Sequence, residues 1–328
     1  MSILVTGGAG YIGSHTAKEL LTANEDVIVL DNLQKGHKDA ARGSRFFQGD
    51  LRDEAFLDRV FKENNIEEVV HFAADSLVGE SVTDPLKYYN NNMVSTLGLL
   101  GKMKDYGVKR LVFSSSAATY GEPENIPILE TDKTLPTNPY GETKLAVEKV
   151  LKWADNAYGI KYVSLRYFNA AGAHISGTIG EDHEPETHLI PIILRAVLDK
   201  QDAIRIFGDD YNTPDGSCIR DYVHVTDLAM AHILALRSLR AGADSRIYNL
   251  GNGKGFSVKE VIQLAKKVTG TNIKETVVPR RAGDPAVLVA SSERIQSELK
   301  WEPKYNDLAM IIETAWKWHR DHPDGYGD

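Results

Sequence analysis

A glycine-rich turn between an apolar strand and a helical segment constrains the fold more than any other feature of the chain. Residues 3–6 (Ile-Leu-Val-Thr) run directly into Gly-Gly-Ala-Gly-Tyr-Ile-Gly at positions 7–13. Gly7 and Gly10 can turn the backbone toward a pyrophosphate, which the free N–H groups and dipole of a helix N-terminus attract. Gly13 lets the helix pack close to the strand. The turn therefore predicts a dinucleotide-binding fold.

An acidic residue, Asp31, ends the second apolar run of the chain, residues 27–31. It follows the glycine turn by about 20 residues, the distance at which such folds place a carboxylate on the ribose 2′-hydroxyl. A carboxylate there repels a 2′-phosphate, so we expect the cofactor to be NAD and not NADP.

Short apolar runs then alternate with segments of helical period, which is the βαβα order of a parallel sheet covered on both faces. The expected strands are residues 3–6, 27–31, 69–72, 110–114 and 161–167. The expected helices between them are residues 12–23, 54–64, 91–106 and 140–158. The sequence thus predicts an α/β chain with a Rossmann-type doubly wound parallel sheet.

The second half of the chain differs in local composition: after about residue 169 it contains loops rich in Gly, Pro, Asp and His. A helix, strand, helix order returns at residues 227–239, 247–250 and 258–269, and residues 307–320 read as a closing helix. The length of 328 residues allows roughly two domains. We expect a dinucleotide-binding domain over residues 1–170, with returning segments near 220–251, and a smaller C-terminal α/β substrate domain over 171–328.

Composition excludes several classes of partner. The chain has 38 Lys and Arg against 46 Asp and Glu, a formal charge of −8, which disfavours nucleic acid and anionic membranes. Its longest apolar stretches, such as residues 189–194, are far shorter than the roughly 20 residues of a transmembrane helix, and the N-terminus lacks a signal peptide pattern. One cysteine, Cys218, excludes internal disulfides and multi-cysteine zinc sites. We expect a cytoplasmic protein.

Tyr140 and Lys144 open a predicted helix directly after Pro139, four positions apart and therefore on one face. An ammonium group beside a phenol favours the phenolate, so we expect Lys144 to lower the pKa of Tyr140 and make it a usable general base. The pair follows the strand that ends at residues 113–116, and ligands bind at the carboxyl ends of strands in open α/β sheets. These two residues are candidates for catalysis.

These segments together carry a family resemblance. Residues 6–13, the serines at 114–116 and the Tyr140-x-x-x-Lys144 pair resemble the extended short-chain dehydrogenase/reductase family. Further segments make nearly the whole chain similar to the UDP-glucose 4-epimerase family within it. They are residues 31–33, 71–73, 166–169, 172–173, 180–182, 220–225, 248–251 and 279–284.

The resemblance implies a tightly held NAD that is reduced and reoxidised in every cycle, on UDP-glucose and UDP-galactose. Tyr140 takes the proton of the sugar 4-hydroxyl while hydride passes from C4 to the nicotinamide; the 4-keto sugar then turns, and hydride returns to its other face. Lys144 holds Tyr140 as phenolate and binds the nicotinamide ribose, and Ser116 hydrogen-bonds the reacting oxygen. Tyr140, Lys144 and Ser116 are thus the predicted catalytic residues.

The resemblance also implies the binding residues, a UDP-sugar domain at 171–328, and a homodimer packed through helices 91–106 and 140–158. Arg220 and Arg281 supply charge to the diphosphate, for which guanidinium forks are suited. The predicted NAD residues are Gly7, Gly10, Tyr11, Ile12, Gly13, Asp31, Asn32, Asp50, Leu51, Phe72, Ala73, Asn91, Tyr140, Lys144 and Phe168. The predicted substrate residues are Ser116, Tyr140, Asn169, His188, Leu189, Phe207, Arg220, Arg281, Asp284 and Leu288.

Three positions depart from the family pattern. Ser76 replaces a lysine and His188 an asparagine that many members carry. Leu288 stands where some members carry tyrosine, which closes the pocket around the sugar 2-substituent. Because leucine is smaller, we expect activity on UDP-GlcNAc and UDP-GalNAc as well.

Residues 181–188 hold Glu181, His183, Glu186 and His188, a set that could bind a metal. They mix ligand types on a loop without helical i, i+4 spacing and fall in the segment matched to the substrate. We therefore predict no metal site.

Three alternatives differ in chemistry. Nucleotide-sugar dehydratases carry Ser-Thr-Asp-Glu at the active strand end, whereas residues 115–118 are Ser-Ser-Ala-Ala, and alanine transfers no proton. A UDP-glucuronate epimerase or decarboxylase stays open, although no feature specifies a C6 carboxylate. A non-catalytic NAD-sensing regulator would need the glycine turn but not Tyr140, Lys144 and Ser116 together.

Overall fold

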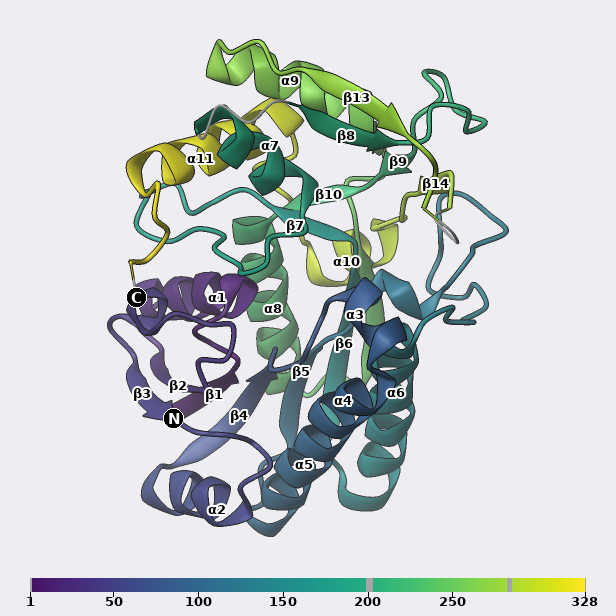
Figure 1. The fold of residues 1–328 in the computed structure, drawn as a ribbon. Helices are drawn as coiled ribbons and strands as arrows, with labels where there is room; N and C mark the ends of the chain where they lie inside the picture. Colours follow the sequence, from purple (N-terminus) through teal and green to yellow (C-terminus); the bar gives the residue numbers. More distant parts are fainter. Residues whose placement is uncertain (1, 199–202, 282–284, 328) are drawn as a thin grey trace.

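A seven-stranded parallel sheet forms the lower part of the molecule in Figure 1. The computed structural model describes residues 2–198, 203–281 and 285–327. The strand order is β11-β6-β5-β4-β1-β2-β3, with every neighbouring pair parallel. The first strand therefore lies inside the sheet. Strands β2 and β3 are added on one side of β1 and the later strands on the other, so the switch point of this doubly wound sheet lies between β1 and β4. The strands are β1 (Ser2–Thr6), β2 (Asp26–Asp31), β3 (Arg45–Gln48), β4 (Ile66–His71), β5 (Arg110–Ser114), β6 (Lys161–Tyr167) and β11 (Arg246–Leu250).

Helices cover both faces of this sheet because its strands are apolar on both sides. On one face α1 (Tyr11–Thr22) and α8 (Val225–Arg240) pack on Val5, Val29 and Val112. On the other face α2 (Glu54–Glu63), α5 (Ser95–Asp105) and α6 (Pro139–Tyr158) pack on Leu4, Ile28 and Leu111. The predicted fold class is confirmed.

Local features explain where the observed elements differ from the predicted ones. The half-exposed edge strand β3 was not predicted, because Arg-Phe-Phe-Gln at 45–48 is short and ends in polar residues. The predicted helix 91–106 begins as a π-helix, η2 (Tyr89–Val94), and continues as α5. β4 starts three residues earlier than the predicted 69–72, because Glu68 is buried against Arg240 and so disguises the apolar run.

The elements of the second half other than α8 and β11 build a smaller unit above the carboxyl ends of the strands (Figure 1). Its core lies between α7 (Leu189–Leu198), α9 (Val258–Thr269), α11 (Leu308–Asp321) and the parallel pair β8 (Ile204–Phe207) and β13 (Glu275–Val278). Short strands join it to the sheet: β7 (Asn169–Ala171) with β10 (Tyr222–His224), and β9 (Ile219–Arg220) between β12 (Phe256–Ser257) and β14 (Val287–Leu288).

The remaining elements are short helices. They are η1 (Lys38–Ala41), α3 (Val78–Thr83), α4 (Pro85–Tyr88), η3 (Ala117–Thr119) and α10 (Glu293–Leu299). Within the part of the chain that the structure describes, no helix has both the length and the apolar composition needed to cross a membrane.

Candidate functional site

The glycine turn between β1 and α1 is shaped by two glycines and leaves room at a third. Gly7 has φ +70°, and a Cβ on it would lie 2.6 Å from the Ala73 nitrogen. A Cβ on Gly13 would lie 2.2 Å from the Gly7 carbonyl oxygen, so only glycine allows this helix to pack on the turn. Gly10 has an ordinary φ of −77°, and its Cβ would meet nothing closer than 3.4 Å. The space beside Gly10 therefore suits a group from outside the chain.

The start of α1 favours an anion. The helix has no acidic residue in its first turn and no side-chain cap on its N-terminal N–H groups, so the positive end of its dipole is uncompensated. Tyr11 and Ile12 occupy this first turn, and the Tyr11 hydroxyl donates to the Gly172 carbonyl at 2.6 Å. The turn and the helix start together fit the pyrophosphate of a dinucleotide.

Asp31 ties the glycine turn to the end of β2. Its carboxylate accepts hydrogen bonds from the backbone N–H groups of Ala9 at 3.0 Å and Leu33 at 2.8 Å. Burial raises the pKa of Asp31, and these N–H groups oppose that shift. Sequence reasoning assigned Asp31 to the ribose alone; the structure adds a role in holding the turn itself.

The other predicted NAD residues lie at the ends of neighbouring strands. Phe72 and Ala73 follow β4, and the Ala73 N–H donates to Thr6 at 3.1 Å, beside Gly7. Asn91 lies half-buried in η2, next to Asn92, whose amide hydrogen-bonds the Asp75 backbone. Phe168 follows β6 and is half-buried. These residues all border the carboxyl edge of the sheet.

Asn32, Asp50 and Leu51 follow β2 and β3, at the same edge. The Asn32 amide donates to Asp50 at 3.2 Å, and Arg52 forms an ion pair with Asp50 at 2.7 Å that lowers the Asp50 pKa. Leu51 is buried. The Asp50 carboxylate thus fixes the loop on which Leu51 sits.

The predicted catalytic residues meet where β5 ends and α6 begins. Asn138 caps α6 by accepting from the Gly141 N–H at 2.9 Å, which places Tyr140 in the first turn of the helix. Ser116 follows β5, and its hydroxyl acts on the Tyr140 phenol, whose pKa it lowers. Lys144 is buried, with Nζ 2.8 Å from the Ser114 carbonyl and 5.8 Å from the centre of the Tyr140 ring. The three side chains therefore form one constellation.

The electrostatics of this constellation correct one prediction. We expected the Lys144 ammonium to lower the pKa of Tyr140, but burial raises the Tyr140 pKa and only the Ser116 hydroxyl opposes this. Burial also lowers the pKa of Lys144 to about 7, although the Glu148 charge acts in the other direction. In the protein alone both groups are thus driven toward their neutral forms, because desolvation outweighs their mutual effect.

A buried ion pair beneath these residues was missed by sequence reasoning. Glu148 and Arg166 are both buried, and Arg166 Nε lies 2.9 Å from Glu148 Oε1. The same carboxylate oxygen accepts from the Ser115 hydroxyl at 2.6 Å. Glu148 stands four positions after Lys144 on α6, so an acid at this spacing was the signal that could have revealed it. The pair joins β5, β6 and α6 under the site.

The predicted substrate residues come from separate segments of the upper unit. Arg220 on β9 is paired in register with Leu288 on β14, and both are half-buried. The Asn169 amide donates to the Asp221 carbonyl at 2.9 Å. The Arg281 guanidinium lies 3.9 Å from the centre of the Phe207 ring. Asp284 lies outside the described residues.

Asp221, which sequence reasoning did not single out, holds together the segments that carry these predicted substrate residues. Its buried carboxylate accepts from the backbone N–H groups of Asn252 at 2.6 Å and Ala290 at 3.2 Å. Burial raises the pKa of Asp221 to about 6. Since Asp221 follows Arg220 and its N–H donates to Leu288 at 3.0 Å, it fixes both neighbours.

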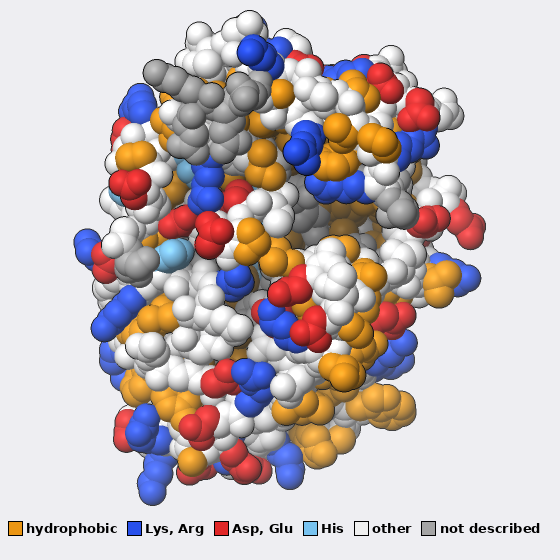
Figure 2. Space-filling view, viewed as in Figure 1, with side chains coloured by type: hydrophobic (Ala, Val, Ile, Leu, Met, Phe, Trp, Pro, Cys, Tyr) orange, Lys and Arg blue, Asp and Glu red, His pale blue; other side chains and the backbone are white. Residues whose placement is uncertain are grey.

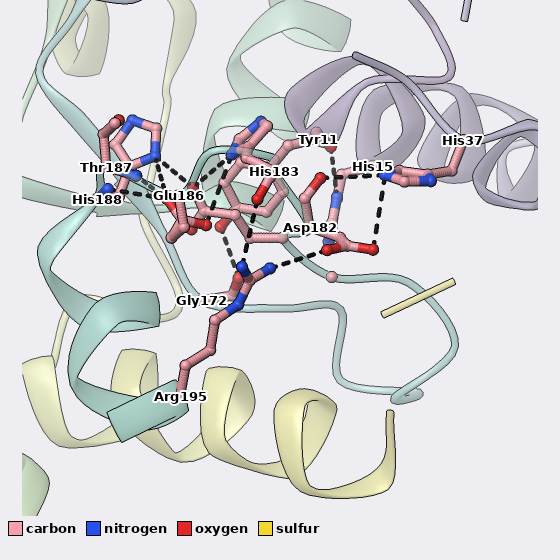
Figure 3. A network of polar contacts seen from close by, with 12 residues as sticks. Tyr11, His15, His37, Gly172, Asp182, His183, Glu186, Thr187, His188 and Arg195 are labelled. Carbon is pink, nitrogen blue, oxygen red and sulfur yellow. Dashed lines mark hydrogen bonds and ion pairs between the residues drawn. The ribbon is translucent and has the colours of Figure 1, made fainter. Parts of the chain in front are cut away.

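The loop before α7 gathers four groups that sequence reasoning set aside. Potential metal ligand atoms of Glu181, His183, Glu186 and His188 all lie within 4.8 Å of one another (Figure 3). The lack of helical spacing, on which we based the prediction of no metal site, does not keep these side chains apart, because the loop folds back on itself. His188, predicted for the substrate, ends this loop, and Leu189, also predicted for the substrate, begins α7.

The fold and the constellation define a class: a doubly wound sheet with a dinucleotide turn and a Ser-Tyr-Lys site is typical of short-chain dehydrogenase/reductase enzymes. The family model described as "NAD dependent epimerase/dehydratase family" matches residues 3–251. A UDP-glucose 4-epimerase of Halalkalibacterium halodurans is 60% identical over 326 residues, covering 99% of this chain and 98% of that protein. Another, from Lacticaseibacillus casei, is 57% identical over 329 residues, covering 100% and 99%.

Solved structures give the same result. A crystal structure of a UDP-glucose 4-epimerase superposes with a TM-score of 0.98 at 56% identity, covering 99% of each chain. The Bifidobacterium longum UDP-glucose 4-epimerase in complex with NAD+ and UDP superposes with a TM-score of 0.93 at 40% identity, covering 99% of this chain and 100% of that one. The chain therefore belongs to the NAD dependent epimerase/dehydratase family and, within it, to the UDP-glucose 4-epimerases. The predictions of an NAD-dependent enzyme and of an isomerase are confirmed.

Proposed function

We propose that the protein interconverts UDP-glucose and UDP-galactose with Tyr140 as the general base. Tyr140, as phenolate, takes the proton of the sugar 4-hydroxyl, and Ser116 donates a hydrogen bond to the same oxygen. The glycine turn and the start of α1 would hold NAD, which would supply a hydride acceptor and donor for C4 of the sugar. Tyr140 then gives its proton back to the oxygen, so that only the configuration at C4 has changed.

One observation carries this proposal: Ser116, Tyr140 and Lys144 meet at the carboxyl end of β5, on the edge of the sheet that also bears the glycine turn. The Ser114 carbonyl accepts a hydrogen bond from Lys144 Nζ and holds it near the Tyr140 ring. When Lys144 is protonated, its positive charge favours the phenolate form of Tyr140. Lys144 is buried and Tyr140 half-buried, which limits the access of water to the proton that Tyr140 exchanges.

An isotope experiment tests this route. UDP-glucose that carries deuterium at C4 is converted, and the product is analysed by NMR. We expect the UDP-galactose formed to keep its deuterium at C4, because the hydride leaves and returns without meeting water. Loss of deuterium to the solvent would show that C4 exchanges as a proton, and would contradict the proposed route.

The proposed binding of the UDP-sugar depends on two positively charged side chains. Arg220 and the Arg281 guanidinium beside Phe207 come from different segments of the upper unit and supply positive charge for a diphosphate. Asn169, His188, Leu189 and Asp284 complete the proposed UDP-sugar contacts. In this proposal residues 1–170 mainly serve NAD and residues 171–328 mainly hold the nucleotide sugar.

The same proposal extends to N-acetylated substrates. Leu288 is half-buried on β14, in register with Arg220, and leucine occupies less volume than tyrosine. A smaller side chain at the sugar 2-position leaves room for an N-acetyl group. We therefore include UDP-GlcNAc and UDP-GalNAc among the proposed substrates.

A homodimer through residues 91–106 and 140–158 is also part of the proposal. Apolar side chains gather over α4, α5 and α6 in Figure 2. Leu86 is 79% exposed, Leu97 49% and Trp153 70%, an unusual exposure for large apolar side chains. Sedimentation of the wild type should give twice the monomer mass, and Trp153→Glu should shift it toward the monomer. A wild type that sediments as a monomer would rule the dimer out.

A further inference from the structure

A compact cluster of two glutamates and two histidines lies in the loop between β7 and α7, at residues 181–188. Glu181 Oε1 is 2.8 Å from His188 Nδ1 and 3.3 Å from His183 Nδ1. Glu186 Oε1 is 3.2 Å from His188 Nδ1, and Glu186 Oε2 is 3.9 Å from His183 Nδ1. Four ligands in a tetrahedron about 2.0 Å from a Zn²⁺ ion stand about 3.3 Å from one another. The observed separations lie on both sides of this value.

The burial of the two carboxylates is the second observation. The Glu181 side chain is 3% exposed and the Glu186 side chain 5% exposed. A buried carboxylate is costly unless it is paired and hydrogen-bonded or coordinates a metal. Two such groups in one loop require a compensating positive charge.

Hydrogen bonds among these side chains do not provide full compensation. Glu181 Oε1, His183 Nδ1 and Glu186 Oε2 are buried atoms that make no hydrogen bond of acceptable geometry. His188 Nδ1 hydrogen-bonds Glu186 Oε1 at 3.2 Å, so its closer approach to Glu181 Oε1, at 2.8 Å, is not a directed hydrogen bond. A hydrogen bond needs the N–H to point at the oxygen, whereas metal ligation needs every lone pair to point at one shared centre.

The surroundings hold the ligands in place, as the outer contacts of metal sites do. Glu186 Oε1 accepts from the backbone N–H groups of Thr187 at 2.7 Å and His188 at 2.8 Å, which leaves Oε2 facing the cluster. Arg195 on α7 donates to the His183 carbonyl at 3.3 Å and to Asp182 at 2.9 Å (Figure 3). The loop is thus fixed from outside while its centre contains unsatisfied ligand atoms.

We propose that Glu181, His183, Glu186 and His188 bind one divalent transition-metal ion, of which Zn²⁺ is the best match. Two imidazole nitrogens and two carboxylate oxygens suit Zn²⁺, and its charge neutralises both glutamates. The role is structural, because all four protein ligands complete a closed tetrahedral site. The ion would join the start of α7 to the loop that packs on Tyr11, whose ring meets His183 edge-on at 6.1 Å.

Metal binding to the NAD-containing protein, without substrate, tests this proposal. Untagged protein is dialysed against a chelator and then titrated with Zn²⁺ by calorimetry, and the bound metal is counted by mass spectrometry after gel filtration. We expect one Zn²⁺ per chain, and a loss of affinity of at least 100-fold in Glu181→Gln and His183→Ala. The matched control is Glu184→Gln, an exposed residue of the same loop, which should bind within twofold of the wild type.

Two results would overturn the metal site. One is a folded wild type that takes up no Zn²⁺ at micromolar concentrations; the other is a Glu181→Gln variant that binds as tightly as the wild type. If a variant fails to fold, wild-type protein loaded with Co²⁺ replaces it: a tetrahedral site gives an intense visible spectrum, whereas an octahedral, water-rich spectrum contradicts the proposal. Because no turnover is measured, these outcomes are independent of the proposed epimerase reaction.

Discussion

The cofactor side and the substrate side of the site are constructed in different ways. On the cofactor side the backbone sets the shape: the Gly7 φ of +70° and the contact distance at Gly13 leave little freedom. On the proposed substrate side, the predicted residues come from separate segments, such as Arg220 on β9 and Arg281 beside Phe207. A backbone shape encoded in a few neighbouring residues thus forms the cofactor side, whereas the proposed substrate side depends on side chains from distant parts of the sequence.

The largest effect is expected at the boundary between the two sides, at Tyr140. Tyr140→Phe removes the proton acceptor but keeps the ring, so kcat should fall on the order of 10³-fold. Bound NAD should be unchanged, because the glycine turn is untouched; it is measured by absorbance after the protein is denatured. The matched control is Tyr158→Phe at the far end of α6, which is exposed and should turn over normally. Near-normal turnover of Tyr140→Phe would remove the assignment of the base.

On the cofactor side, a substitution that adds a Cβ at a tightly packed glycine of the turn should be destabilising. Gly13→Ala forces a Cβ to 2.2 Å from the Gly7 carbonyl, and should lower the free energy of unfolding by about 3 kcal/mol, together with NAD affinity. Gly101→Ala in α5 meets nothing within 4 Å and should stabilise the helix by up to about 1 kcal/mol. Urea unfolding of both variants measures the contrast, and equal stability of the two would mean that the turn is not tightly constrained.

Asp31 is an exception on the cofactor side, because there a side chain holds the backbone of the glycine turn. Asp31→Asn removes the charge and keeps an acceptor for Ala9 or Leu33, so the turn should survive. Without repulsion of a 2′-phosphate, the NAD to NADP affinity ratio should fall about 30-fold, or roughly 2 kcal/mol. Titration of both cofactors checks this, and an unchanged ratio would remove Asp31 from cofactor selection.

The smallest effect is expected on the substrate side. Leu288→Tyr should lower the rate on UDP-GlcNAc about tenfold relative to UDP-glucose, since a larger ring fills the space for the N-acetyl group. Stability and NAD content should stay as in the wild type, because Leu288 lies on a two-residue strand at the margin of the upper unit. Equal rates on N-acetylated substrates in both proteins would show that Leu288 is not the gate.

The same contrast explains what the sequence could predict. The glycine turn, the strand ends and the Tyr140–Lys144 spacing are local patterns, and they were sufficient for the fold class and for the Tyr140–Lys144 pair, whereas Ser116 was predicted from the family resemblance. The Glu148–Arg166 pair and the Asp221 hub were not predicted, because each depends on segments that meet only after folding. The predicted lowering of the Tyr140 pKa was wrong for a related reason. Burial raises this pKa, and the burial of a side chain is a property of the folded protein.

The most direct test of the proposed epimerase function uses the purified protein with no added cofactor. Incubation with UDP-glucose in one sample and UDP-galactose in another, followed by NMR, should drive both to the same equilibrium mixture, and about one NAD per chain should be recovered after denaturation. Stoichiometric NAD without any conversion from either side would contradict the account, and would favour a protein that binds the dinucleotide without catalysis.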